Sequence, residues 1–434
     1  MKESLEELRE EFQYNKTNSC VQCGYCLPVC PTYVTTRIET HSPRGRINLV
    51  KMVGEGKITD LSVLEEPLDL CLGCRACETA CPTGVEYGSI LESARAALVK
   101  RKKFKAPVRL LRKTMFQNVF PSKTAMNVIG NTFWLYEKSG LQKAMRKTGI
   151  MKKLPYHLGE FEATMSQAVS PAERKQAPSK AKAKGEKKYT VAFFTGCIMD
   201  AMFHRINRLS VQLLAEAGCD VIVIPNQTCC GALHAHSGEI EEAKRLAKQN
   251  IAAFEQENVD FIVNNAGGCG AMLHEYDHLL ADDQEWADRA AAFTAKSRDI
   301  SQVLVACGGL PNLRSNPEER VTYQPSCHMT NVQKVTEEPL NLLKSISGIN
   351  FVEMEQANMC CGSAGIYNII NYDASMDILD EKMKHTKATG ASVVITTNPG
   401  CLIQMKLGIE REKLSDSVRA LHLVEYLAEA AGIS

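Results

Sequence analysis

The feature that most constrains this chain of 434 residues is a cysteine pattern that occurs twice near the N-terminus. The first copy consists of Cys20, Cys23, Cys26, Cys30 and Pro31, and the second of Cys71, Cys74, Cys77, Cys81 and Pro82. The two-residue gaps allow three thiolates to surround one group from a tight loop. Each proline turns the chain away, because it disfavours helix at the residue before it. The segment is therefore expected to fold around whatever its thiolates bind.

This spacing is typical of chains that bind two [4Fe–4S] clusters, in which the fourth cysteine of each copy ligates the other cluster. We expect one cluster on Cys20, Cys23, Cys26 and Cys81, and the other on Cys71, Cys74, Cys77 and Cys30. Zinc and buried structural thiols are the alternatives, but a zinc ion takes four ligands and has no use for a third cysteine step. Between the copies, Arg44 and Arg46 are candidates to stabilise a reduced cluster by their charge. A solvated turn is the other interpretation of these arginines.

Eighteen cysteines are unusual in a chain of this kind. The first residues, MKESLEELREEF, are acidic and lack the basic segment followed by an apolar segment that is typical of a signal peptide. No stretch approaches the 18 consecutive apolar residues of a membrane-spanning helix. We therefore expect a cytoplasmic protein, in which many cysteines indicate metal or redox chemistry rather than disulfides. A formal net charge of +1 argues against a nucleic-acid partner.

The middle of the chain has no cysteine. Eight lysines and arginines and no acidic residue lie within residues 100–113, so this segment is a candidate for peripheral contact with an anionic membrane surface. A solvated helix face is the favoured alternative. Residues 106–188 are expected to form a helical connector followed, from Ser170, by a flexible basic linker that has no apolar run to bury.

The last 246 residues alternate strand-like and helix-like segments. Strands are predicted at 189–194, 221–225, 259–264, 321–324, 349–354 and 392–397, with helices at about 201–217, 239–256, 332–346 and 374–388. Such alternation predicts βαβ units and mainly parallel sheets. We expect a multidomain α+β protein with a mostly helical dicluster domain at 1–105. Two duplicated α/β domains then follow at 189–310 and 311–434.

Cysteines repeat in step with this duplication. The first half has Cys197, Cys229, Cys230 and Cys269, and the second has Cys327, Cys360, Cys361 and Cys401. Each follows a predicted strand, and the carboxyl edge of a parallel sheet is where sites assemble. The alternative, buried structural cysteine, is preferred for Cys219 and Cys307, which have no counterpart in the other half.

Other chemistries have weaker support. Cys327-His328, His204, His234 and His236 raise the question of thiol nucleophiles with bases, but the histidines are not repeated between the halves. Helix-face or core positions are the expected role of these histidines, and no catalytic residue is predicted. Neither GxGxxG nor GxxxxGK[ST] occurs at the start of a βα unit, so no flavin or nicotinamide site is expected in this chain.

Several longer segments carry a family resemblance: SPRGRI at 42–47, CLGCRACETACPTGV at 71–85, TGC at 195–197, CCGALHAHSG at 229–238, NNAGGCGAM at 264–272 and CCGSAGIYN at 360–368. With them, essentially the whole chain resembles the iron-sulfur subunit of glycolate oxidase (glycolate dehydrogenase). The CCG pairs also place it in a wider group with lactate-utilisation proteins, the anaerobic glycerol-3-phosphate dehydrogenase small subunit and heterodisulfide reductase.

The resemblance implies an electron-transfer subunit that accepts electrons from an FAD-containing partner and passes them to quinone or another acceptor. It also implies one or two further iron-sulfur clusters in the CCG halves. D-lactate or glycerol 3-phosphate as substrate, and a catalytic subunit like heterodisulfide reductase, are the alternatives. The chain departs from heterodisulfide reductase at Cys269 and Cys401, single cysteines where that family has two. This departure favours electron transfer over disulfide cleavage.

Overall fold

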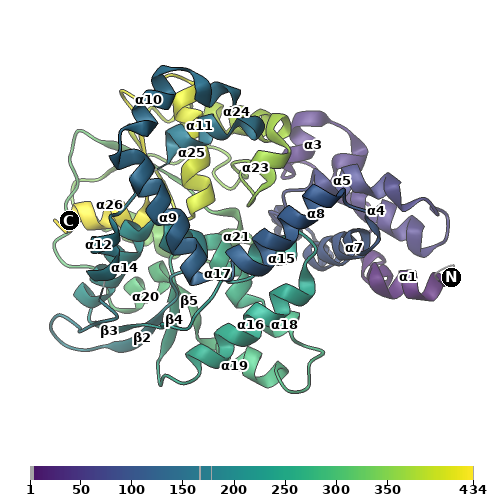
Figure 1. Cartoon of the computed structure of the whole chain (residues 1–434), viewed down its shortest axis with the longest axis horizontal. Helices are drawn as coiled ribbons and strands as arrows, with labels where there is room; N and C mark the ends of the chain where they lie inside the picture. The colour runs from purple at the N-terminus through teal and green to yellow at the C-terminus, as the bar shows by residue number, and fades with distance from the viewer. Residues whose placement is uncertain (1–3, 166–167, 177, 434) are drawn as a thin grey trace.

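The computed structural model describes residues 4–165, 168–176 and 178–433, and it has a helical N-terminal part joined to two sheet-containing halves (Figure 1). The helices of the N-terminal part are α1 (Leu5–Glu11), α2 (Tyr14–Thr17), α3 (Pro31–Thr36), α4 (Pro43–Gly54), α5 (Glu65–Asp69), α6 (Ala76–Thr79) and α7 (Tyr87–Arg101), with short 3-10 turns at Glu39–His41 and Leu61–Leu64. No strand occurs among its described residues.

Local sequence explains the two long helices of this part. Ser42 caps α4, because its Oγ accepts a hydrogen bond from the Gly45 amide at 3.0 Å, and Pro43 occupies the first helical position. The buried side chains of α7 include Ile90, Ala94 and Ala97, which recur at helical spacing and pack into one core. The two cysteine loops lie over this core.

The connector is helical, as predicted, and it crosses the molecule. Its elements are α8 (Ala106–Lys113), a π-helical turn (Thr114–Val119), α9 (Lys123–Lys138), α10 (Leu141–Lys147), two 3-10 turns (Ile150–Lys153 and Pro155–His157), α11 (Leu158–Thr164) and α12 (Pro171–Gln176). In Figure 1, α8, α9 and α10 run in sequence across the front of the molecule.

The two halves contain the predicted parallel sheets. The first sheet has the order β1-β3-β2-β4-β5, formed by Lys180–Ala181, Cys219–Val223, Tyr189–Phe193, Phe261–Asn264 and Ser297–Asp299. The second has the order β7-β6-β8-β9, formed by Asn350–Phe351, Arg320–Gln324, Val393–Thr396 and Arg419–His422. All pairs are parallel except β1 with β3. The predicted α+β multidomain fold class is confirmed.

Helices cover both sheets. In the first half they are α13 (Cys197–Met202), α14 (His204–Glu216), α15 (Ala232–His236), α16 (Ile240–Phe254), α17 (Gly267–His274), α18 (Tyr276–Leu279), α19 (Ala287–Lys296) and α20 (Ile300–Ala306). In the second half they are α21 (Cys327–Asn331), α22 (Glu337–Lys344), α23 (Tyr367–Ile370), α24 (Tyr372–Ala388), α25 (Pro399–Arg411) and α26 (Leu423–Ala430).

The expected flexible linker needs correction. Residues 180–181 form β1, which pairs with β3 at the edge of the first sheet, while Ala177 lies outside the described residues. The Ala183 amide and the Lys182 ammonium group both bind the Asp220 carboxylate at 3.0 Å. The linker was predicted to be flexible because it has almost no apolar side chain to bury. It is ordered instead by strand pairing and by its contacts with the Asp220 carboxylate.

One hydrophobic core runs through both halves. Val191 and Phe193 of β2 belong to the same buried cluster as Val321 of β6 and Val393 of β8. Helix α14 also packs against α26, and α17 against α21. The two halves therefore share one hydrophobic core and are not separately packed domains.

Gly267 at the contact of α17 with α21 offers a test of this packing. A Cβ at Gly267 would lie 2.2 Å from Ser326 Oγ, whereas one at the neighbouring Gly268 would approach no atom closer than 3.4 Å. We expect Gly267→Ala to lower the free energy of unfolding by about 1–3 kcal/mol, the usual cost of overpacking, and Gly268→Ala to change it little. Chemical denaturation of the two variants measures this difference, and equal stabilities would contradict the described contact.

Candidate metal centres

The first predicted set of cysteines gathers at the surface. Cys20, Cys23, Cys26 and Cys81 line one hollow, whose wall also includes Val21, Tyr25, Arg44, Cys77 and Pro82. Gln22 and Gly24 have positive φ angles of 59° and 89°, so the loop turns sharply between its cysteines. Cys23 is exposed and the other three are partly buried. Cys81 thus joins the first copy of the pattern across about 60 residues of chain, as the crossed arrangement requires.

The second set is more deeply buried. Cys30, Cys71 and Cys77 are buried and Cys74 is half-buried. Burial raises the pKa of Cys77, and the adjacent Cys74, Cys71 and Cys30 thiolates raise it further, which indicates that the four sulfur atoms lie close together. The structure therefore brings together the four predicted members of this set.

Cys71 is surrounded by groups that favour its thiolate form. Burial would raise the pKa of Cys71, but the Arg46 and Arg95 guanidinium groups act against burial and leave the pKa below its ordinary value. The Tyr87 hydroxyl donates to Cys71 Sγ at 3.3 Å, and the Gly73 amide donates at 3.4 Å. Charge and hydrogen bonds thus stabilise the form of cysteine that binds iron.

The two candidate arginines differ in environment. Arg46 is only 1% exposed, donates to the carbonyl oxygen of Pro67 at 2.6 Å, and has no carboxylate partner among the described residues. Arg44 lies at the surface, where its Nε donates to the Glu39 carboxylate at 2.7 Å. The charge of Arg46 is therefore the less compensated of the two, and it faces the second set.

The cysteines of the first half meet at the carboxyl edge of its sheet. Cys197 begins α13 after β2, the pair Cys229 and Cys230 follows β3, and Cys269 lies in α17 after β4. Cys197 Sγ and Cys229 Sγ are 3.4 Å apart. Cys230 and Cys269 also interact directly through their side chains.

The second half repeats this arrangement. Side-chain contacts connect Cys327 with Cys360, Cys360 with Cys361, and Cys361 with Cys401. No group of three or more His, Cys, Asp or Glu side chains in the described part of the chain is placed to hold a single metal ion.

A buried lysine, which sequence analysis did not identify, distinguishes the second half. Lys382 is fully buried and donates to the carbonyl oxygens of Gln356 and Ala357 at 2.9 and 2.8 Å. Burial lowers its pKa to about 8, although the nearby Cys361, Cys360 and Cys401 thiolates oppose this change. In the first half, Asn250 lies 20 residues after Cys230, compared with 21 residues between Cys361 and Lys382, and donates to the Cys229 carbonyl at 3.0 Å. Only the position in the second half carries a charge.

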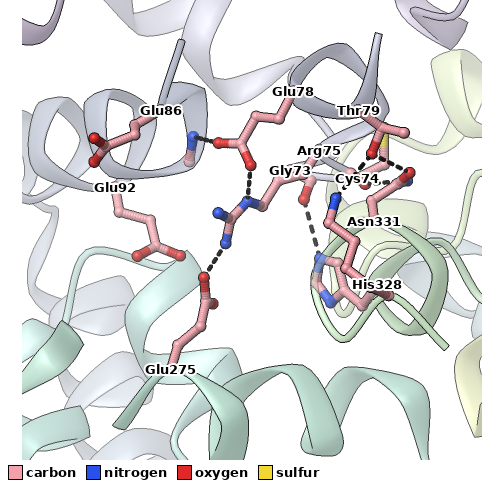
Figure 2. A network of polar contacts seen from close by, with 12 residues as sticks. Gly73, Cys74, Arg75, Glu78, Thr79, Glu86, Glu92, Glu275, His328 and Asn331 are labelled. Carbon is pink, nitrogen blue, oxygen red and sulfur yellow. Dashed lines mark hydrogen bonds and ion pairs between the residues drawn. The ribbon is translucent and has the colours of Figure 1, made fainter. Parts of the chain in front are cut away.

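Helix α21 joins the second half to the loop of the second cysteine set (Figure 2). His328 Nε2 lies 3.0 Å from the carbonyl oxygen of Gly73, and Asn331 Nδ2 donates to the carbonyl oxygen of Cys74 at 2.9 Å. Thr79 Oγ1 donates to Asn331 Oδ1 at 3.0 Å. Cys327 begins the same helix. Burial raises the pKa of Cys74, and the nearby Cys327 thiolate raises it further.

Arg75 connects the same loop to the first half. Its guanidinium group binds Glu78 at 2.7 Å and also Glu275, which lies just after α17 (Figure 2). Burial raises the pKa of Glu275, although Arg75 opposes this effect. Arg75 adopts a left-handed conformation with φ of 58°, so the loop turns sharply at this residue. The loop is therefore held by both halves at once.

The remaining histidines have structural contacts. His234 is buried and its Nε2 lies 2.7 Å from the carbonyl oxygen of Phe116 in the connector. His204, the first residue of α14, pairs with Asp200 of α13 at 3.1 Å. His236 lies near the His328 ring and pairs with Glu92 at 3.2 Å. These contacts tie the connector and the N-terminal part to the first half.

Comparison with known families finds matches in several parts of the chain. Residues 16–85 match the 4Fe-4S dicluster domain, residues 107–165 match the linker region of the glycolate oxidase iron-sulfur subunit, and residues 191–274 and 321–406 match the cysteine-rich CCG domain. The chain is 51% identical over its full length to the probable glycolate oxidase iron-sulfur subunit of Bacillus subtilis, of which it covers 98%. The chain belongs to the family of glycolate oxidase iron-sulfur subunits.

More distant relatives agree with this family. The glycolate oxidase iron-sulfur subunit of Escherichia coli is 28% identical over 91% of this chain and 92% of its own length. Lactate utilization protein A of Oceanobacillus iheyensis is 37% identical over 55% of this chain and 96% of its own. A crystal structure of a hypothetical protein from Helicobacter pylori has the same fold, with a TM-score of 0.57, 9% identity, and coverage of 99% of this chain and 77% of that one. As a family member, the chain is an iron-sulfur protein.

The contrast between Arg46 and Arg44 gives a prediction for the reduction potential of the dicluster domain. We expect Arg46→Met to lower one cluster potential by roughly 60 mV, the one-electron equivalent of about 1.4 kcal/mol, because it removes a buried positive charge that acts on Cys71. Arg44→Met should change the potentials much less, since Glu39 already compensates that charge. A redox titration followed by EPR measures both. Arg46→Lys, which keeps the charge, should stay near the wild type, and a drop as large as that of Arg46→Met would indicate a structural effect instead.

Proposed function

We propose that the chain is the electron-transfer subunit of a glycolate-oxidising complex. An FAD-containing partner would remove two electrons from glycolate, and this chain would pass them to quinone or another acceptor. The observation that carries the proposal is the full-length match to a glycolate oxidase iron-sulfur subunit, with all sixteen repeated cysteines present. Iron-sulfur clusters bound at these cysteines would supply one-electron chemistry. The chain itself contributes ligands, spacing and charge.

We assign Cys20, Cys23, Cys26 and Cys81 to one [4Fe–4S] cluster, Cys71, Cys74, Cys77 and Cys30 to a second, and the eight cysteines of the CCG halves to one or two further clusters. The position of Cys81 beside the first copy of the pattern, and of Cys30 beside the second, supports this assignment. In each CCG half four thiols meet at one sheet edge, which supports a separate cluster in each.

The contacts of α21 support an order along the chain. A covalent and hydrogen-bonded path leads from Gly73, beside Cys74, through the His328 ring to Cys327. Lys382 places a buried positive charge beside the second CCG set, where negative charge is favoured. At the matching described positions, the first half has neither a histidine in contact with the cysteine loop nor a buried lysine. We therefore propose that electrons pass between the second dicluster set and the second CCG half.

The first cysteine set supports contact with a protein partner. Cys23 is exposed, and the side chains of Val21 and Tyr25 beside it are 63% and 68% exposed. Exposed apolar side chains over a cluster loop give a partner a surface on which to approach it closely. We propose that one redox partner of the chain docks on this loop.

Glycolate is preferred to D-lactate or glycerol 3-phosphate as the substrate of the complex. The observation that favours it is the match of residues 107–165 to the linker region of the glycolate oxidase iron-sulfur subunit. The lactate utilization protein of Oceanobacillus iheyensis matches only 55% of this chain.

The test is anaerobic purification of the chain together with any bound flavoprotein, followed by iron analysis and low-temperature EPR. We expect about twelve or more iron atoms per chain and glycolate-dependent reduction of the clusters. About eight iron atoms would contradict clusters in the CCG halves. Reduction by D-lactate but not by glycolate would overturn the substrate. Cys23→Ser and Cys74→Ser should each lose or alter one cubane signal, and unchanged iron and spectra would refute the ligand assignment.

His328 gives a separate prediction for the proposed order. We expect His328→Leu, which removes the hydrogen bond to Gly73, to slow electron exchange between the second dicluster set and the second CCG half several-fold at unchanged iron content. His328→Gln keeps a donor and should retain part of the rate. Lys334→Met is the control, because Lys334 contacts only the exposed side of Thr79, at 3.2 Å. Freeze-quench EPR measures the exchange, and equal rates in all three variants would refute the path.

We also propose peripheral contact of α8 with an anionic membrane. The exposed fractions of Val108, Leu110 and Leu111 are 43%, 67% and 62%. In residues 100–113, Lys100, Arg101, Lys102 and Arg112 pair with carboxylates of this chain. Lys103, Lys105, Arg109 and Lys113 have no such ion pair among the described residues. Exposed apolar side chains beside uncompensated charge favour an anionic lipid surface. No helix in the described part of the chain is long and apolar enough to span a membrane.

Vesicle binding tests this contact. We expect the protein to sediment with vesicles of phosphatidylglycerol and phosphatidylcholine, and the double variant Leu110→Gln and Leu111→Gln to bind about tenfold more weakly or worse. Leu135→Gln, which removes a leucine of similar exposure from α9, should bind normally. Absence of binding by the wild type, or equal binding by all variants, would refute the proposal.

A further inference from the structure

Two cysteines that belong to none of the four sets lie in contact. The sulfur atoms of Cys219 and Cys307 are 3.5 Å apart, and the two residues are 0% and 2% exposed. Cys219 is the first residue of β3, and Cys307 ends α20. The pair therefore lies at the amino end of a sheet whose carboxyl edge carries the other cysteines of this half. Five residues of β3 correspond to roughly 16 Å of separation, and two thiols are too few for a cubane.

The charges around the pair make the two thiols unequal. The ammonium group of Lys188 donates a hydrogen bond to the carbonyl oxygen of Cys307, and its charge favours thiolate at both cysteines. The contact with Cys219 and the charge of Lys188 lower the pKa of Cys307, while the same contact, burial and the Asp260 carboxylate raise the pKa of Cys219. The sulfur of Cys307 is thus the better nucleophile, and Cys219 stands beside it as a second thiol.

The pair lies directly beneath the surface. Cys307 precedes Gly308 and Gly309, which have positive φ angles of 84° and 85°. A Cβ built on either glycine would meet no atom within 4 Å, so the turn faces open space. Cys307 is therefore next in sequence to a turn that faces open space.

We propose that Cys307 and Cys219 form a reversible disulfide when the protein meets a hydroperoxide. With hydrogen peroxide, the Cys307 thiol would lose its proton and attack as thiolate, the O–O bond would break, the sulfur would become a sulfenic acid, and the departing hydroxide would take up that proton and leave as water. The Cys219 thiol would then attack this sulfur, lose its proton, and release a second water as the S–S bond forms. Two thiols are oxidised and one hydrogen peroxide is reduced to two waters, so the step balances.

The bond would close a loop that contains most of the first half. Positions 219 and 307 are 88 residues apart in sequence, and the segment between them includes Cys229, Cys230 and Cys269. The bond would join the start of β3 to the end of α20 and so restrict the opening of this half while leaving its carboxyl edge unchanged. The protein would thus respond to the oxidant without oxidising any of the cysteines proposed to bind clusters.

The test treats the anaerobically purified holoprotein with a limiting amount of hydrogen peroxide. Free thiols are then alkylated, and the chain is digested and analysed by mass spectrometry. We expect a linked pair of peptides containing Cys219 and Cys307 before iron is lost, and its disappearance after treatment with dithiothreitol. In Cys219→Ser, Cys307 should be trapped as sulfenic acid by a dione reagent. In Cys307→Ser, position 219 should give little or no such product.

A lysine pair provides the matched control. Lys188→Gln should slow formation of the link by about threefold or more, because the thiolate of Cys307 loses a neighbouring positive charge. Lys187→Gln should leave the rate unchanged, since Lys187 pairs with Asp220 at 3.5 Å instead. The proposal is overturned if peroxide releases iron or links cluster ligands before positions 219 and 307 react, or if both lysine variants react at the wild-type rate. Neither result depends on the substrate or partner of the complex.

Discussion

The arrangement of this protein depends on two hydrogen bonds to main-chain carbonyl oxygens. Gly73 and Cys74 lie in the loop of the second cysteine set, and their carbonyls face α21 of a half more than 250 residues away in sequence. Through these bonds the helix that starts at Cys327 is aligned with the loop. Because each bond joins a side chain of α21 to a main-chain carbonyl at or beside Cys74, the second cysteine set is held in position relative to Cys327. Arg75 gives the same loop a second attachment, to Glu275.

The two CCG halves share a topology but have different surroundings. Both deliver four cysteines to one sheet edge, and both end on a single cysteine in the last segment of the repeat. The second half adds Lys382 where the first has Asn250, and it alone contacts the Gly73 and Cys74 carbonyls among the described residues. The two sets of four cysteines are therefore similar in arrangement but differ in their electrostatic surroundings.

Sequence spacing predicted much of the fold, for reasons that are local. Cysteines two residues apart specify a loop, and alternating apolar strands and helices specify a parallel sheet, so the fold class and the gathering of cysteines at the sheet edges were both accessible. Strands β5 and β9 were missed because Ser297–Asp299 and Arg419–His422 are short and partly polar. Strand β1 was missed because its order comes from an edge pairing and from Asp220. The roles of His328, Asn331 and Lys382 depend on packing between distant segments, which no local pattern reveals. The cluster ligands themselves stay predictions.

The shared hydrophobic core has a consequence for how the protein comes apart. Since Val191 and Val393 belong to one buried cluster, neither half can open without exposing apolar surface of the other. The two CCG halves should therefore assemble and fail as one cooperative unit. Clusters bound in both halves, as proposed above, would then be lost together, so a population of these molecules would contain mainly fully loaded and fully emptied forms, with few half-loaded ones.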